Sequence, residues 1–206
     1  MKRLVLASSN EHKLKEYQRI LSPYGIKVIS AKELGVELEV DESGKTYREN
    51  AILKALAYAD KLKNEWIISD DSGLEVMCFK KYELGVHTAR YMQDRPYKER
   101  LQSVIDRANA SELSIGRLAK FNCCIVLANY SKGLHVFFDT TGGMIDYKIH
   151  DGKTGFGYDP IFFSFELFKN FADATTEEKD LVSHRGKCAR KLARFLIHRT
   201  EKKCVS

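Results

Sequence analysis

Several features that define special classes of protein are absent from this sequence. No apolar run approaches the roughly 18 residues of a membrane-spanning helix. No repeat, low-complexity tract or proline-rich linker occurs, and the 206 residues include only three prolines. The apolar run that follows Lys2 and Arg3 stops at Ser8, which is too short for the core of a signal peptide. We therefore expect a cytoplasmic protein without a membrane partner.

Cysteine is present, but in a pattern that argues against both disulfides and zinc. The five cysteines are an odd number, and the side chains of the adjacent Cys123 and Cys124 would point to opposite faces of a strand. No pair of cysteines or histidines has the short spacing of a structural zinc site. Free thiols in a reducing compartment are the expected state.

Composition and charge indicate a compact domain that favours an anionic partner. Hydrophobic residues make up 44% and charged residues 30% of the chain, near the averages of soluble globular proteins. We expect one domain of two lobes over residues 1–200 and a C-terminal tail over 201–206. The net charge of +6 is partly concentrated within 185–203, which leaves a nucleotide, a nucleic acid or a solvated helix face open.

Hydrophobic periodicity and chain-breaking residues predict strands and helices alternating around a mixed sheet, which is an α/β domain with mixed α+β character. Strands are expected at 3–7, 27–30, 66–69, 74–79, 121–128 and 134–140, the last two as an antiparallel pair. Helices are expected around Leu14, Tyr17 and Leu21, at 50–62, at 96–107, and near the C-terminus, where Cys188, Leu192, Phe195 and Leu196 share one face. Capping patterns at Thr46 and within 175–178 mark two helix starts.

The first candidate site is the polar loop between the first expected strand and helix. It consists of Ser8, Ser9, Asn10, Glu11, His12 and Lys13. Backbone N–H groups and the positive end of the helix dipole favour an anion there, and the lysine could reach a phosphate. The glycines of a Walker loop are missing, so an ordinary helix cap is the alternative.

The second candidate site is an Asp-Asp-Ser-Gly turn at 70–73, expected where a central strand ends. Magnesium prefers hard oxygen ligands, and Asp70 and Asp71 offer two adjacent carboxylates. The acidic loop 37–45 could supply a further ligand through Asp41 or Glu42. A structural turn capped by Asp and Ser is the alternative interpretation.

The third candidate site is the glycine-rich segment 155–160, within a longer loop over 152–160. Its glycines allow the backbone to approach a ligand closely, and Phe156 or Tyr158 offers a flat face to a base. The alternative is a loop whose aromatic side chains pack into the core.

The fourth candidate site combines Lys179 with Ser183, His184 and Arg185 near a helix start. Such a group could bind triphosphate oxygens or hydrogen-bond a purine carbonyl. A solvated basic stretch is the alternative, and Cys188 just beyond it fits the core better than a nucleophile.

Six short segments together carry a resemblance to a known family. They are Ser8-x-Asn10-x-x-Lys13, Glu49-Asn50-Ala51 with Lys54-Ala55, residues 70–74, Ala89-Arg90-Tyr91, residues 155–162, and Ser183-His184-Arg185-Gly186. In this order and spacing, along most of the chain, they resemble the inosine triphosphate pyrophosphatase family, the RdgB-like enzymes that act on non-standard purine nucleoside triphosphates.

The resemblance implies a long twisted mixed sheet flanked by helices, two lobes with a central active-site cleft, and usually a homodimer. It implies that Asp71 binds Mg²⁺ and is the general base that prepares the attacking water, with Asp41 or Glu42 as a further ligand and Asp70 assisting. The loop 8–13 matches the triphosphate-binding loop, and Ser72 matches a substrate contact. The base and phosphate pocket matches Phe156, Gly157, Tyr158, Asp159, Lys179, His184 and Arg185.

The implied reaction is attack of water on the α-phosphorus of the nucleotide and release of pyrophosphate. Mg²⁺ and Lys13 would neutralise the charge that develops on the bridging and leaving oxygens. A pocket that hydrogen-bonds a 6-oxo purine leaves polar groups unpaired when adenine enters, at about 1–3 kcal/mol for each buried group. The family resemblance implies ITP, dITP and XTP as the substrates.

Two places depart from the family pattern. Residues 85–88 read Gly-Val-His-Thr where the family commonly has Gly-x-x-Ser, although Thr88 retains a hydroxyl. The glycine that usually follows the phenylalanine at position 138 is replaced by Asp139. No family pattern can be placed on residues 106–120.

Three other functions compete with this one. A Maf-like pyrophosphatase would act on pyrimidine or modified dNTPs, and a basic nucleic-acid-binding module would explain the sequence pI near 9.0. Carboxylate clusters repel nucleic acid unless a cation intervenes, so we expect no stable nucleic-acid partner. A catalytically dead relative is disfavoured by the presence of Lys13, Asp71 and Arg185.

Overall fold

The computed structural model describes residues 2–80, 82–152 and 155–204. The chain divides into two compact units: unit 1 is Met1–Asp71, Cys123–Asp139 and Arg185–Ser206, and unit 2 is Ser72–Asn122 and Thr140–His184. Lys153 and Thr154 of the predicted glycine-rich loop, and the last two residues of the predicted tail, lie outside the described residues. Among those described, no helix is long and apolar enough to cross a bilayer.

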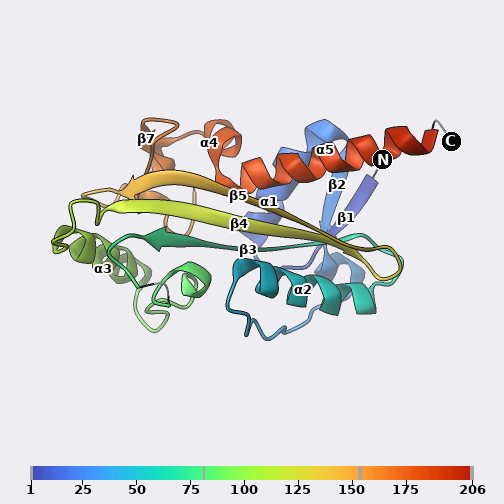
Figure 1. Ribbon diagram of the computed structural model, residues 1–206, viewed down its shortest axis with the longest axis horizontal. Helices are drawn as coiled ribbons and strands as arrows, with labels where there is room; N and C mark the ends of the chain where they lie inside the picture. Colours follow the sequence, from blue (N-terminus) through green and yellow to red (C-terminus); the bar gives the residue numbers. More distant parts are fainter. Residues whose placement is uncertain (1, 81, 153–154, 205–206) are drawn as a thin grey trace. The chain divides into compact units, whose positions relative to one another are not determined.

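The described strands form one mixed sheet in the order β2-β1-β3-β4-β5-β6-β7 (Figure 1). They are β1 (Lys2–Leu6), β2 (Ile26–Ser30), β3 (Ile67–Val76), β4 (Leu118–Asn129), β5 (Gly133–Ile145), β6 (Phe162–Ser164) and β7 (Lys169–Asn170). Strand β1 pairs in parallel with β2 and β3, whereas β6 pairs antiparallel with β5 and β7. The predicted mixed α/β class is confirmed.

Unit 1 contains the parallel strands and three helices, α1 (Glu11–Leu21), α2 (Tyr47–Lys61) and α5 (His184–Cys204). Parallel neighbours need a crossover, and α1 and α2 provide it after β1 and β2. Helix α2 begins in the predicted capping box, in which Thr46 and Glu49 satisfy each other's backbone N–H groups. Its backbone approaches β3, where Ser69 Oγ donates to Ala51 O at 2.5 Å.

The core of unit 1 joins apolar faces from strands and helices. Its larger fully buried members are Leu4, Leu6, Tyr17, Leu21, Ile68, Ile125, Leu127 and Leu192.

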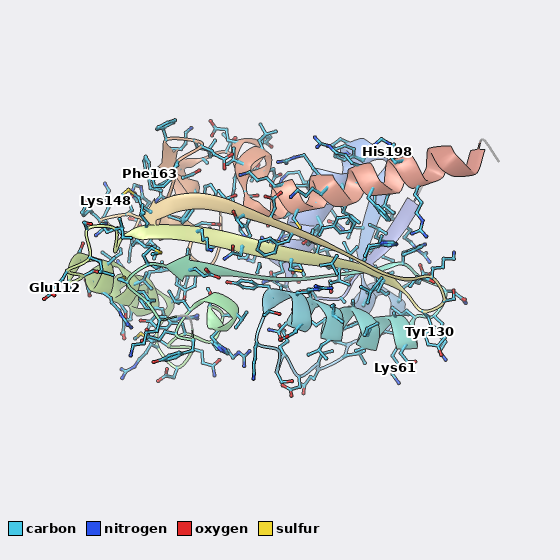
Figure 2. All side chains as sticks on the ribbon, viewed as in Figure 1. Lys61, Glu112, Tyr130, Lys148, Phe163 and His198 are labelled. Atoms are coloured by element: carbon cyan, nitrogen blue, oxygen red, sulfur yellow. The ribbon has the colours of Figure 1, made fainter. Side chains whose placement is uncertain are left out.

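Tyr130 lies in the three-residue connection between β4 and β5, where Figure 2 labels it. Helix α5 continues through Cys204, so the first residues of the predicted tail are helical.

Unit 2 contains α3 (Tyr97–Asn109), α4 (Thr176–Val182), two short strands and an aromatic core. The rings of Phe121, Phe162 and Phe171 lie within 4.7–6.2 Å of one another, centroid to centroid. Two 3₁₀ turns, η4 (Asp159–Ile161) and η5 (Phe171–Asp173), flank this core. The glycine-rich loop enters η4 directly, so its end is rigidly connected to the core of unit 2.

The predicted turn at 70–73 is wrong, because β3 runs without interruption from Ile67 to Val76. Asp70 and Asp71 therefore lie inside a strand and not at its end. The turn preference of Asp, Ser and Gly is overridden by strand pairing and by side-chain contacts that hold each residue extended. Gly73 is needed there, since a Cβ at this position would lie 2.1 Å from Gly85 O.

Other boundaries also differ from the prediction. The predicted antiparallel strands are longer, because β4 begins at Leu118 and β5 extends to Ile145. Residues 106–120 comprise the end of α3, a connection and the start of β4. The C-terminal helical region is two helices separated at Ser183, whose backbone is extended. Capping at Thr175 begins the first of them, as predicted.

The cysteines with described side chains carry free thiols. Cys123, Cys124 and Cys188 are buried in unit 1, and Cys78 is half-buried in unit 2. Burial raises the pKa of Cys124 to about 12, so this thiol stays protonated at neutral pH. These residues behave as small apolar side chains of the core.

Candidate active site

The predicted site residues fall into two sets, one in each unit. Unit 1 contains Ser8, Ser9, Asn10, Glu11, His12, Lys13, Asp41, Glu42, Asp70, Asp71 and Arg185. Unit 2 contains Ser72, Phe156, Gly157, Tyr158, Asp159, Lys179 and His184. Each set is described by itself below.

The loop 8–13 is shaped by the cap of α1. Asn10 Oδ1 accepts hydrogen bonds from the backbone N–H groups of His12 and Lys13, at 2.9 and 3.2 Å, and Ser8 Oγ accepts one from Asn10 N. Ser9, Glu11 and His12 are exposed, whereas Lys13 is half-buried. The loop is therefore a true helix cap, and its lysine points toward Asp70 on β3.

Asp70 is enclosed by two cations. Lys13 Nζ lies 2.6 Å from its Oδ1, and Arg185 Nε lies 2.9 Å from its Oδ2. Burial alone would raise the pKa of Asp70, but Lys13 and Arg185 together hold it well below its usual range. Asp70 is thus a permanent anion whose two oxygens both face side-chain cations.

Arg185 is the centre of a buried ion network. Its Nη1 lies 2.6 Å from Glu16 Oε2, and its side chain is only 3% exposed. Burial opposes its charge, but Asp70 and Glu16 raise the pKa of the guanidinium well above its ordinary value. The interpretation of this segment as a solvated basic stretch is therefore wrong for Arg185.

Asp71 has a different environment from its neighbour. Its Oδ2 accepts a hydrogen bond of 3.1 Å from Asn50 Nδ2, and the residue is 7% exposed. Burial raises the pKa of Asp71, Lys54 and Asn50 oppose that rise, and the negative charge of Glu42 adds to it. A carboxylate with a raised pKa beside another carboxylate is a common property of catalytic and metal-binding groups.

The acidic loop is fastened to α2, which brings one of its carboxylates to Asp71. Glu42 Oε2 lies 2.9 Å from Lys54 Nζ, and Gly44 N donates to Asn50 Oδ1 at 2.8 Å. A Cβ on Gly44 would lie 2.6 Å from that same amide oxygen, so only glycine fits this approach. Asp41 is exposed. Of the two predicted alternatives, Glu42 is the one that affects the charge state of Asp71.

The donor set in unit 1 suits a hard cation. Among the residues whose side chains are described, no three His, Cys, Asp or Glu groups converge in the manner of a protein-only metal cage. The negative charge of Glu42 acts on Asp71, and Lys54, whose Nζ lies 2.9 Å from Glu42 Oε2, partly offsets it. A divalent cation would relieve the repulsion that remains. Mg²⁺ typically uses one or two carboxylates and completes its octahedron with water and substrate phosphates. The residues present fit that ion.

The unit 2 set is organised around a buried ion pair. Lys179 Nζ lies 2.7 Å from Asp159 Oδ2, with the two side chains only 5% and 4% exposed. The same carboxylate oxygen accepts a hydrogen bond from Phe156 N, and Lys179 Nζ stands 5.0 Å from the centre of the Phe156 ring. A Cβ on Gly155, whose φ is +90°, would clash with the Asp159 side chain. These contacts fold the loop tightly around one carboxylate.

The remaining predicted residues of unit 2 support the loop or stack in the core. Tyr158 OH donates to Thr88 O at 3.1 Å, and Gly157 O accepts from the Tyr97 hydroxyl. The His184 ring stacks on Phe121 at 4.7 Å and 11°. Ser72 is half-buried in β3. Tyr158 is therefore a buried support of the loop, whereas Phe156 remains half-exposed.

Four residues of these networks were assigned no role from the sequence: Glu16, Asn50, Lys54 and Thr88. Glu16 and Lys13 are three apart on α1, and Asn50 and Lys54 are four apart on α2, so helical spacing could have placed each pair on one face. The hydroxyl of Thr88, noted only as a departure, bonds with the backbone of Leu74 at 3.0 and 3.1 Å. No local signal connects Glu16 with Arg185, because 169 residues separate them.

A model described as the Ham1 family matches residues 4–195. A protein of Caldanaerobacter subterraneus subsp. tengcongensis named dITP/XTP pyrophosphatase is 35% identical over 205 residues, covering 98% of this chain and 99% of that protein. A protein of the same name from Aquifex aeolicus is 38% identical over 94% of this chain and 96% of its own length.

The fold comparison agrees with the sequence comparison. The structure of the Staphylococcus aureus Ham1 protein superposes with a TM-score of 0.81 at 33% identity, covering 96% of this chain and 100% of that one. The resemblance seen in the sequence motifs is thereby confirmed. Neither the family match nor the names of these relatives support the Maf-like alternative.

Proposed function

This chain belongs to the Ham1 family, and from that premise we propose that it hydrolyses non-standard purine nucleoside triphosphates, ITP, dITP and XTP, to the monophosphate and pyrophosphate. Such a reaction removes damaged purines from the nucleotide pool. Support comes from the relatives named dITP/XTP pyrophosphatase and from the charged network of unit 1. The observation that carries the proposal is the contrast between Asp70, held anionic by two cations, and Asp71, a buried carboxylate with a raised pKa.

We assign the general base and metal-binding role to Asp71. Its raised pKa makes it a better proton acceptor than an exposed aspartate, while the Asn50 amide fixes the direction of one oxygen. Glu42 is proposed as the second carboxylate toward Mg²⁺, in preference to Asp41. When bound, Mg²⁺ would neutralise phosphate charge and orient the attacking water.

Lys13 is proposed as the cation for the triphosphate. The N–H groups of Asn10, His12 and Lys13 already donate within the cap, so the ammonium is the group assigned to the phosphate. Its ammonium is held by Asp70, which is held in turn by Arg185. Asp70 and Arg185 are therefore assigned positioning roles. The family resemblance implies a metal contact for Asp70 and a phosphate contact for Arg185; we assign the metal contact to Asp71 and the phosphate contact to Lys13. Preorganised charge of this kind costs little reorganisation during reaction.

The unit 2 set is proposed to recognise the purine. Phe156 supplies a half-exposed ring, and the fold of the loop around Asp159 and Lys179 presents backbone groups of fixed direction. Ser72 and His184 are proposed as further substrate contacts. A polar site built for a 6-oxo purine rejects adenine because donors and acceptors would be left unpaired.

A substrate panel tests the function. Pyrophosphate release is measured with Mg²⁺ for ITP, XTP and dITP against ATP, GTP, dUTP and dTTP. We expect kcat/KM for ITP and XTP to exceed that for ATP and GTP by at least about tenfold, roughly 1.4 kcal/mol in transition-state binding. A smaller preference, or a preference for dUTP or dTTP, would reject purine sanitising.

Three further properties belong to this proposal. Activity is expected to require Mg²⁺ and to stop on addition of a chelator.

We also propose that the protein works as a cytoplasmic homodimer, with residues 1–200 as its enzymatic domain. Light scattering during size-exclusion chromatography would measure the mass of the assembly, and a monomer at micromolar concentration would contradict the dimer.

A further inference from the structure

His150 is an unassigned side chain that lies just before the glycine-rich loop. Its Nδ1 is 2.6 Å from Asp173 Oδ2, and its Nε2 is 2.9 Å from Asp146 Oδ2. The second contact has the distance of an ion pair but lacks the direction of a hydrogen bond. The histidine and Asp146 side chains are each only 18% exposed. One imidazole thus stands between two carboxylates from different segments of unit 2.

The backbone around His150 is bonded to the far end of the glycine-rich loop. His150 N donates to Pro160 O at 2.9 Å, and Asp146 N donates to Ile161 O at 2.8 Å. Asn170 Nδ2 also donates to Pro160 O, at 3.3 Å, and to Asp146 Oδ2, at 3.2 Å. The segment before the loop and the turn that ends it are therefore joined through one set of residues, which we call the His150 clamp: Asp146, His150, Asn170 and Asp173.

The backbone that follows the His150 clamp packs closely against η5. A Cβ on Gly152 would lie 1.9 Å from Ala172 O, so the backbone passes directly against η5. Asp173, at the end of η5, is the residue that binds His150 Nδ1. The contact between His150 and Asp173 thus holds η5 where the backbone at Gly152 can lie against Ala172 O. Figure 2 labels Lys148 and Phe163, which lie in the segments on either side of the loop.

The clamp and the Asp159 carboxylate act on different parts of the same loop. Asp159 binds Phe156 N and Lys179 from inside, whereas the clamp fixes the backbone before Gly152 and at Pro160. Residues 155–160 are held by Asp159 and at Pro160, so they lose little conformational freedom when a ligand binds, and preorganisation of this kind raises affinity without new contacts.

We propose that His150 is a positioning residue for purine recognition, which acts by fixing both ends of the loop that carries Phe156. This inference rests on the proposed function of that loop. A carboxylate oxygen can only accept a hydrogen bond, so His150 Nδ1 is the donor to Asp173 Oδ2, and Asp146 Oδ2 lies 2.9 Å from the other ring nitrogen.

The experiment compares three variants in the full chain. His150→Ala removes the whole contact, and His150→Asn keeps an amide that can donate to Asp173. Lys169→Gln removes an exposed ion pair with Glu178 in the same unit and is the matched control. We measure kcat and KM for ITP, together with hydrogen exchange of the loop amides.

His150→Ala is expected to raise KM for ITP by about tenfold while kcat stays within about twofold, because binding is weakened and the reacting groups of unit 1 are untouched. His150→Asn should fall between this variant and the wild type, and Lys169→Gln should match the wild type. Exchange at residues 155–161 should be faster in the alanine variant than in the asparagine variant.

Two results would overturn the inference alone: an active His150→Ala enzyme with wild-type KM, or a fall in kcat with unchanged KM. If the His150→Ala chain fails to fold, His150→Asn is the deciding variant. Unchanged KM for ITP and unchanged loop exchange in His150→Asn would then reject the inference. A wild-type protein that hydrolyses no purine triphosphate would instead reject the proposed function, and the inference with it.

Discussion

Asp70 and Asp71 follow one another in β3, yet their pKa values are shifted in opposite directions. Asp70 lies 2.6 Å from Lys13 Nζ and 2.9 Å from Arg185 Nε, which lower its pKa despite burial. Asp71 accepts from the neutral amide of Asn50, and burial raises its pKa. Successive strand residues point to opposite faces of a sheet, so one peptide unit separates two chemical environments.

The Asp71→Asn variant is expected to lose turnover and to gain stability at neutral pH. The raised pKa means that the folded state binds this proton more tightly than the unfolded state, so stability falls as pH rises from 3.8, the ordinary pKa of an aspartate, through the higher folded pKa. The neutral amide removes that loss. Thermal unfolding at pH 7 and at pH 3.5 should show a higher Tm for the variant at pH 7 only, and nucleotide binding by calorimetry should persist. Retained turnover would assign the base elsewhere.

Asp70→Asn should have the opposite effect on stability. The lowered pKa means that the Asp70 anion stabilises the fold above pH 3.8, and that this contribution is lost as pH falls below it toward the folded pKa. Breaking one side of a buried ion network costs about 3–5 kcal/mol. Urea unfolding at pH 7 measures the loss. Glu37→Gln, which breaks the exposed pair with Lys32, is the control and should change stability by less than about 1 kcal/mol. Equal effects of the two variants would contradict the network.

The metal ligand in the acidic loop can be identified by two matched substitutions. Glu42→Gln should raise the Mg²⁺ concentration for half-maximal activity by about tenfold, because it removes a carboxylate whose charge acts on Asp71. Asp41→Asn should leave that concentration near the wild-type value, since Asp41 is exposed. A Mg²⁺ titration of pyrophosphate release measures both. The reverse order of effects would assign the ligand to Asp41.

Asp159→Asn should destabilise the protein by about 3–5 kcal/mol, because it leaves the Lys179 charge buried without its carboxylate. The amide oxygen can still accept from Phe156 N, so the loss reports on the charge and not on the turn. Chemical unfolding compared with Lys169→Gln, which alters an exposed pair with Glu178, gives the difference. A cost below about 1 kcal/mol would show that Lys179 finds other partners.

Local features of the chain were predictable where the cause is local. The caps at Asn10, Thr46 and Thr175 depend on residues three apart or fewer, and the corresponding helices begin where the sequence places them. The parallel crossovers around β1 and β2 follow from alternating strand and helix patterns. Carboxylates suited to magnesium and the cation in the first loop are also visible in the residues themselves.

The sequence by itself therefore determined the family, the α/β class and the elements that depend on local patterns. Tertiary structure alone decided which oxygen faces which charge, because Arg185 meets Asp70 across 115 residues and Glu16 across 169. It also decided that residues 70–73 are a strand, since pairing with neighbouring strands supplies backbone hydrogen bonds that no local turn preference can offset. The opposite pKa shifts of Asp70 and Asp71 follow from burial and from charges that are distant in the sequence. Two adjacent aspartates in a sequence reveal neither cause.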